Sequence, residues 1–151
     1  MTAPTTDDQP APADPNATAD GPSPATDWWL PRIVAAAAVL DGVARRTRVV
    51  RDAGLTASLD TPVWLKCEHE QHTGSFKLRG AYHRVANADP QRRQRGVVAA
   101  SAGNHAQGVA FAAAAFGVPA TIFVPAGANP VKVARTRRLG ARVEEVPGGV
   151  E

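Results

Sequence analysis

One lysine stands in a segment whose residue types could make it reactive. The segment TGSFKLRGAY places Lys77 directly after the bulky Phe76 and close to the expected start of a helix. Apolar neighbours and the positive end of a helix both disfavour an ammonium ion, so such a lysine is more nucleophilic as the free amine. An arbitrary lysine is far more often a solvated surface cation. The segment therefore has two interpretations, a reactive amine or an ordinary surface charge.

A second segment, SAGNHAQG, has the composition of an anion-binding loop. The small residues Ser101, Ala102 and Gly103 allow a ligand to approach the backbone closely. A helix expected to begin at Asn104 directs its free N–H groups and positive dipole end to the same place, which favours an anion such as a carboxylate. Alternatively, Ser101 and Asn104 serve only as helix caps, a common use of both residue types. His105 either contacts a substrate there or only faces the cleft.

Alternating strands and helices are expected to hold both segments at one edge of a sheet. Short apolar runs predict strands at 63–67, 97–100, 120–125 and 141–146, and helical periodicity with matching caps predicts helices from Asp27 to the arginines that follow it and at 76–88, 104–117 and 129–140. Strands and helices that alternate at these lengths indicate parallel pairing in an α/β fold. Ligands bind at the carboxyl ends of strands in such sheets, where both segments are expected to lie.

The first 27 residues differ in composition from the rest. They contain six of the 13 prolines, five aspartates and neither lysine nor arginine, so their small apolar surface cannot offset the entropy of ordering and we expect a disordered tail. The sequence has no basic and apolar leader and no apolar run of about 18 residues, so neither a secretory signal nor a membrane span is expected. A single cysteine, Cys67, is typical of a reducing compartment, which indicates a cytoplasmic location.

The remaining residues are basic, but their pattern argues against several classes of site. Without the tail, 17 basic and nine acidic residues leave a net charge of +8. No aromatic residues are interleaved with the arginines to stack on bases, so we expect no nucleic-acid partner. The spacing of Cys67, His69 and His72 matches no standard zinc pattern, and we expect no metal site. Neither glycine-containing segment has the GxGxxG spacing of a Rossmann nucleotide site.

Together and in this order, the two segments resemble a known family. GSFKLRGA, followed by a strand and SAGNHAQGVA, is similar to the pyridoxal phosphate (PLP) enzymes of the tryptophan-synthase-β fold type, and most similar to threonine (serine) dehydratases. The similarity runs from about residue 61 to residue 147 and includes the lead-in KCEHEQHTGSFKLRGAY. It implies an α/β fold of parallel sheets with flanking helices.

The resemblance implies a role for each residue of the two segments. By position, Lys77 corresponds to the residue that holds PLP through its amine and later removes the substrate α-proton, with Phe76 as its packing neighbour. Asn104 corresponds to the residue that hydrogen-bonds the 3′-oxygen of the cofactor. The residues implied in binding the substrate carboxylate are Ser101, Ala102, Gly103, Asn104 and His105. The implied partners are a small amino-acid substrate and, for the full-length protein, further copies of itself.

The implied reaction is the dehydration and deamination of L-threonine or L-serine to a 2-oxo acid and ammonia. In related serine racemases the position of Ala102 is a serine that acts as a second acid and base, so the methyl group here favours dehydration over racemisation. A racemase, a β-replacing lyase and a catalytically inactive fragment are the alternatives. A biosynthetic role, in isoleucine formation, and a catabolic role are both open.

The resemblance also implies a division into domains and a missing part. Residues 28–78 are expected to begin the large PLP-binding domain and residues 79–151 to form most of the small domain that closes over substrate. The resemblance implies a glycine-rich phosphate-binding loop further along the chain, and Gly148 and Gly149 offer too few N–H donors to replace it. A parallel sheet of about four strands also needs cover on both faces. We therefore expect a chain truncated at its C-terminus, in which Arg79 pairs with an acid of the missing part.

Overall fold

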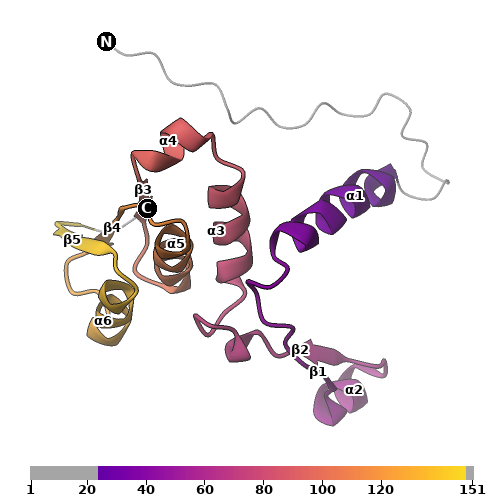
Figure 1. Cartoon of the computed structure of the whole chain (residues 1–151). Coiled ribbons are helices and arrows are strands. Elements are labelled where there is room, and N and C mark those ends of the chain that lie inside the picture. Colours follow the sequence, from indigo (N-terminus) through magenta and orange to yellow (C-terminus); the bar gives the residue numbers. More distant parts are fainter. Residues whose placement is uncertain (1–23, 149–151) are drawn as a thin grey trace. The chain divides into compact units, whose positions relative to one another are not determined.

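The computed structural model describes residues 24–148, with side chains from Trp28 onward, and divides the chain into two compact units at residues 35 and 36 (Figure 1). The expected disordered tail lies outside the described residues as far as residue 23. Helix α1, Pro24–Val39, begins three residues earlier than expected, at a proline. Proline suits the first turn of a helix, because its missing N–H has no partner there in any case.

The second unit begins with a small antiparallel pair of strands. Strand β1, Val49–Arg51, pairs with β2, Trp64–Lys66, so that Val50 lies opposite Leu65. Helix α2, Ala53–Leu59, joins them and is capped by Asp52, whose carboxylate accepts a hydrogen bond from the N–H of Leu55 at 2.8 Å. The strand predicted at 63–67 is thus confirmed, but it pairs antiparallel with β1 and lies outside the parallel sheet of the predicted α/β fold. A connection this short returns the chain beside itself in the opposite direction, whereas parallel strands need a longer crossover.

Three parallel strands form the main sheet, in the order β3-β4-β5. They are β3 Val97–Ala100, β4 Ala120–Pro125 and β5 Arg142–Val146, and helices α5 (Asn104–Ala115) and α6 (Pro130–Arg138) make the two crossovers. The predicted strands and helices of this half are confirmed. Their ends follow the expected capping rules, since Asn129 accepts hydrogen bonds from Val131 and Lys132 at 3.0 and 3.3 Å and Gly140 follows α6 with φ of 90°.

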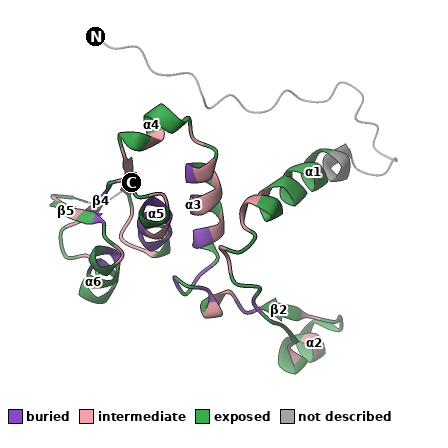
Figure 2. Cartoon of the chain, viewed as in Figure 1, coloured by how far each residue is buried: buried purple, intermediate pink, exposed green. Residues whose placement is uncertain are grey.

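Small side chains dominate the core of this half. Helix α3, Lys77–Ala86, packs against α5, and Leu78 and Ile122 are completely buried. The α5 face of this core is made mostly of alanine: Ala106, Ala110, Ala112 and Ala113. Figure 2 shows buried residues on α3, α5 and α6, whereas α2 and β2 are mainly exposed. Short side chains let neighbouring helix backbones approach closely, and this closeness shapes the site described below.

Two short elements complete the described residues. The 3-10 turn η1, Glu68–Glu70, follows β2, and α4, Pro90–Gln94, follows α3. The sequence analysis predicted neither of them. None of the helices from residue 24 to residue 148 has the length and apolar character needed to cross a membrane.

Candidate active site

Lys77 is the first residue of α3. Its amine lies 5.2 Å from the centre of the Phe76 ring, within the range of a cation–π contact. Both residues are nevertheless exposed, and Phe76 is 59% exposed. The described residues therefore do not enclose the amine, which differs from the apolar shielding we expected from Phe76.

The turn that leads to Lys77 buries two hydroxyl groups. Gly74 has φ of 71°, a left-handed conformation that favours glycine, and its N–H donates to the carbonyl of Gln71 at 2.8 Å. This turn leaves Thr73 and Ser75 only 7% exposed. Neither hydroxyl has a hydrogen-bond partner among the described residues. Two unsatisfied polar groups within four residues of Lys77 provide hydrogen-bonding capacity that a polar ligand or a water can use.

A bidentate ion pair anchors the first turn of α3. Arg79 donates from Nε and Nη2 to the two carboxylate oxygens of Glu68 at 2.9 and 2.8 Å. Thr47 adds a hydrogen bond to Glu68 at 2.6 Å. The hydrogen bonds from Arg79 are the main cause that lowers the pKa of Glu68 from 4.5 to about 2, against an opposing effect of burial. The prediction that Arg79 pairs with an acid of a missing part is therefore wrong, because its partner lies in the lead-in segment of this chain.

A buried glutamine fastens the same lead-in to the segment before β1. Gln71 is 3% exposed; its Oε1 accepts from the N–H of Arg45 at 3.0 Å, and its Nε2 donates to the carbonyl of Arg45 at 3.1 Å. Arg79 also donates to that carbonyl, at 3.1 Å. Glu68 and Gln71 were not predicted from the sequence as positioning residues. Their signal was present in the lead-in KCEHEQ, which places polar residues between a strand and the lysine segment.

The start of α5 carries no side-chain cap. Its N-cap residue is Gly103, and the hydroxyl of Ser101 accepts a hydrogen bond from the Gly103 N–H at 3.2 Å rather than from an amide inside the helix. Asn104 is the first helical residue and is exposed, as is His105, while Ser101, Ala102 and Gly103 are partly exposed. The interpretation of Ser101 and Asn104 as simple caps is therefore wrong. The N–H groups at this helix start remain available to an anion.

Close packing of two helices brings the two segments together. The N–H of Ser101 donates to Phe123 at 3.0 Å, which holds the loop at the end of β3. Further along α5, the backbone at Gly108 touches the peptide of Lys77 so closely that a β-carbon there would lie 3.0 Å from the Lys77 carbonyl oxygen. Lys77 and the loop of residues 101–105 thus belong to one packed unit. Their individual roles toward a cofactor stay predictions.

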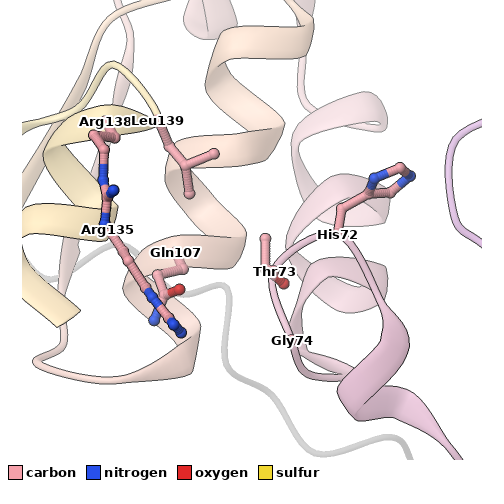
Figure 3. A pocket seen from close by; sticks show the side chains of 7 residues that line it. All are labelled: His72, Thr73, Gly74, Gln107, Arg135, Arg138 and Leu139. Atoms are coloured by element: carbon pink, nitrogen blue, oxygen red, sulfur yellow. The ribbon is translucent and has the colours of Figure 1, made fainter. Parts of the chain in front are cut away.

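A cavity of about 510 Å³ opens beside the lysine segment (Figure 3). It is lined by His72, Thr73, Gly74, Gln107, Arg135, Arg138 and Leu139. In Figure 3 the side chains of Thr73 and Gln107 lie near each other, and that of Arg135 extends from α6 toward Gln107. The lining includes neither Lys77 nor any residue from 101 to 105. This cavity is therefore a neighbour of the predicted cofactor site and not the site itself.

The potential metal ligands that lie close together are not the three residues considered in the sequence. Potential ligand atoms of Cys67, His69 and Glu70 lie within 4.8 Å of one another, and His72 is not among them. Glu70 accepts a hydrogen bond from Nε of Arg48 at 3.0 Å, and this ion pair lowers the pKa of the Glu70 carboxyl. Arg48 therefore competes with any cation for that carboxylate.

Comparisons with known proteins concern the family and the fold of the chain. Residues 40–151 match the protein family described as pyridoxal-phosphate dependent enzyme. The chain is 51% identical over 104 residues to an L-threonine ammonia-lyase of Thermotoga maritima and 48% identical over 111 residues to an L-threo-3-hydroxyaspartate ammonia-lyase of a Pseudomonas species. These alignments cover 69% and 74% of this chain but 26% and 35% of the two relatives. A maize serine racemase structure superposes with a TM-score of 0.73 at 33% identity, over 78% of this chain and 36% of that one. The chain thus spans between a quarter and two fifths of the length of these proteins.

Proposed function

The chain belongs to the family of pyridoxal-phosphate-dependent enzymes, and from that premise we propose that its protein dehydrates and deaminates L-threonine or L-serine, releasing a 2-oxo acid and ammonia. The observation that carries the proposal is the contact between α3, which begins at Lys77, and α5, whose uncapped start lies one turn from that contact. An amine that can accept a proton and a helix start that can bind a carboxylate, held in one packed unit, are two of the groups that elimination from an amino acid uses. Two relatives named as ammonia-lyases support the same class of reaction.

The described residues offer groups for the ring of PLP but not for its phosphate. Bound PLP supplies an electron sink for the negative charge that develops at the substrate α-carbon. Lys77 offers an exposed amine that makes no ion pair with the described residues, and Asn104 offers an exposed amide at the start of the neighbouring helix. The unsatisfied hydroxyls of Thr73 and Ser75 add hydrogen-bonding capacity. A loop for the phosphate is expected outside residues 24–148.

Each side chain then has a definite task. Nζ of Lys77 binds the cofactor and afterwards accepts the proton that leaves the substrate α-carbon. The first N–H groups of α5 bind the substrate carboxylate, and the hydrogen bond from Gly103 to Ser101 keeps the loop in the shape that exposes them. Asn104 orients the ring, and His105 is placed to contact the substrate. The methyl group of Ala102 has no proton to exchange, which favours elimination over racemisation.

The similarity to a serine racemase supplies the alternative activity. The maize enzyme shares the fold of this chain at 33% identity, and the same lysine and loop would serve either reaction. Parallel measurements of 2-oxo acid formation and of D-serine formation from L-serine distinguish the two. We expect 2-oxo acid to dominate, and a racemisation rate equal to the elimination rate would contradict the assignment.

Our first prediction concerns Lys77 itself. Borohydride reduction of the protein mixed with PLP should attach the cofactor at Lys77, as located by peptide mass spectrometry. We expect Lys77→Ala to remove this attachment and to reduce 2-oxo acid formation at least a thousandfold, roughly the scale of losing an essential catalytic group. Lys132→Ala is the matched control, since Lys132 is an exposed lysine of α6. Attachment to Lys66 or Lys132 in the wild type, with none at Lys77, would overturn the assignment.

The proposal also covers the location, the domain boundary and the oligomeric state of the enzyme. We propose a cytoplasmic location, a boundary near residue 79 between a large and a small domain, and a homo-oligomeric full-length protein. The low cysteine content supports the first of these. Light scattering of the full-length protein tests the last, and a monomeric mass would contradict it.

A further inference from the structure

Gly108 is an unfavourable residue for its place in the fold. It lies in the interior of α5, where glycine costs roughly 1 kcal/mol of helix stability relative to alanine. It is also buried, with alanines on the same helix around it. Glycine at such a position indicates that a side chain would collide with something.

The obstacle is the backbone of the catalytic lysine. A β-carbon at Gly108 would lie 3.0 Å from the carbonyl oxygen of Lys77, 3.1 Å from its carbonyl carbon and 3.2 Å from the amide nitrogen of Leu78. Each of these is a backbone atom, so none can rotate away as the end of a flexible side chain would. An added methyl group would therefore push the two helices apart by a few tenths of an ångström.

Gly108, which makes this contact, lies on the same face of α5 as Asn104, the predicted cofactor residue. Asn104 and Gly108 are four residues apart in α5, so they lie on one face of the helix, separated by about one turn of 5.4 Å. The face of α5 that touches Lys77 is thus the face that presents Asn104. Figure 1 shows α3 and α5 side by side, as their extensive contact requires.

The two residues that follow Lys77 restrict how far the first turn of α3 can move away from α5. Leu78 is completely buried, and Arg79 is held by Glu68 through two hydrogen bonds. The first turn of α3 therefore cannot move away from α5 without disturbing buried packing or the ion pair. The distance between the Lys77 backbone and the start of α5 depends on how closely the two helices approach at Gly108.

We propose that Gly108 is a positioning residue for Lys77: the absence of a side chain at residue 108 sets the distance between the reactive lysine and the loop of residues 101–104. The inference rests on the proposed function, in which Lys77 is the reactive amine. It adds a residue of α5 that contacts neither substrate nor cofactor and acts through the backbone of α3.

The chain contains a matched control for this proposal. Gly80 lies in α3, three residues after Lys77, and a β-carbon there would meet nothing within 4 Å. Gly80→Ala therefore adds the same methyl group near the same lysine without a collision. Alanine at this exposed helical position should also stabilise the protein, since it is the better helix former.

The experiment compares Gly108→Ala with Gly80→Ala and the wild type in the full-length protein. Two quantities are measured: the rate at which borohydride fixes PLP to Lys77, and kcat and KM for L-threonine. We expect Gly108→Ala to lower the rate of fixation and kcat by about three- to tenfold with KM changed less than twofold, because a displacement of 1 Å costs on the order of a hundredfold. We expect Gly80→Ala to match the wild type in both.

The outcomes separate this inference from the proposed function. If PLP is not fixed at Lys77 in the wild type, the proposed function itself fails. If fixation occurs there but Gly108→Ala equals Gly80→Ala, only the positioning role fails. If the single variant Gly108→Ala does not fold, the double variant Gly108→Ala/Gly80→Ala is measured in its place, because Gly80→Ala adds helix stability. Unfolding of the double variant as well would contradict the proposal, because Gly108 would then serve folding rather than positioning.

Discussion

The two halves of the candidate site are built in different ways. Side chains hold the lysine half: Glu68, Gln71 and Arg79 tie the lead-in and the first turn of α3 to the segment around Thr47. Backbone contacts hold the loop half: the N–H of Ser101 donates to Phe123, and Gly108 packs against the backbone of Lys77, while the start of α5 has no side-chain cap. The difference teaches that side chains fix the segment around Lys77 in place, whereas the loop of residues 101–105 keeps its N–H groups free, and each arrangement suits the role proposed for it.

The largest expected effect comes from breaking the side-chain half. Glu68→Ala should lower the free energy of unfolding by about 2–3 kcal/mol, because it leaves the half-buried guanidinium of Arg79 without its charged partner. Glu70→Ala is the matched control: its partner Arg48 is far more exposed, so a much smaller loss of stability is expected. Urea denaturation measures both. Equal losses in the two variants would show that the Glu68 pair does not anchor α3.

An acid titration should weaken the same half in the wild type. The pKa of Glu68 is about 2 when folded, below its ordinary value of 4.5, so its stabilising contribution is fully present above about pH 5. The contribution decreases as protonation becomes favourable, between pH 4.5 and about 2. The stability difference between wild type and Glu68→Ala should therefore be constant from pH 5 to 7 and shrink below 4.5. A difference that persists to pH 2.5 would contradict the ion-pair explanation.

A substitution at the start of α5 is expected to change stability least but to weaken substrate binding strongly. Gly103→Asp introduces a carboxylate cap at the start of α5, where a β-carbon would meet nothing within 4 Å. Replacing a glycine cap changes stability by only a few tenths of a kcal/mol, roughly. The new carboxylate occupies the N–H groups proposed for substrate, so KM for L-threonine should rise at least tenfold while Gly103→Ala changes it little. An unchanged KM in Gly103→Asp would exclude this helix start as the carboxylate site.

Local patterns predicted the half of the fold that contains β3, α5, β4, α6 and β5. Apolar runs, the Asn129 cap and the closing glycines act over a few residues, so the sequence displays them directly. The missed elements, β1, α2, η1 and α4, are three to seven residues long and contain no buried residue. Without a buried face they have no periodic apolar signal, and the antiparallel pairing of β1 with β2 followed from their docking rather than from their composition.

The sequence by itself determined the family and the residues proposed for the chemistry: the resemblance is visible in the segments around Lys77 and Asn104, whose residue types and order need no coordinates. Only the tertiary structure decided how those segments meet. It paired Arg79 with Glu68 instead of with an acid elsewhere, and it placed the backbone of Gly108 against that of Lys77. The physical reason is range, since capping and periodicity depend on near neighbours, while these contacts depend on how closely whole helices dock.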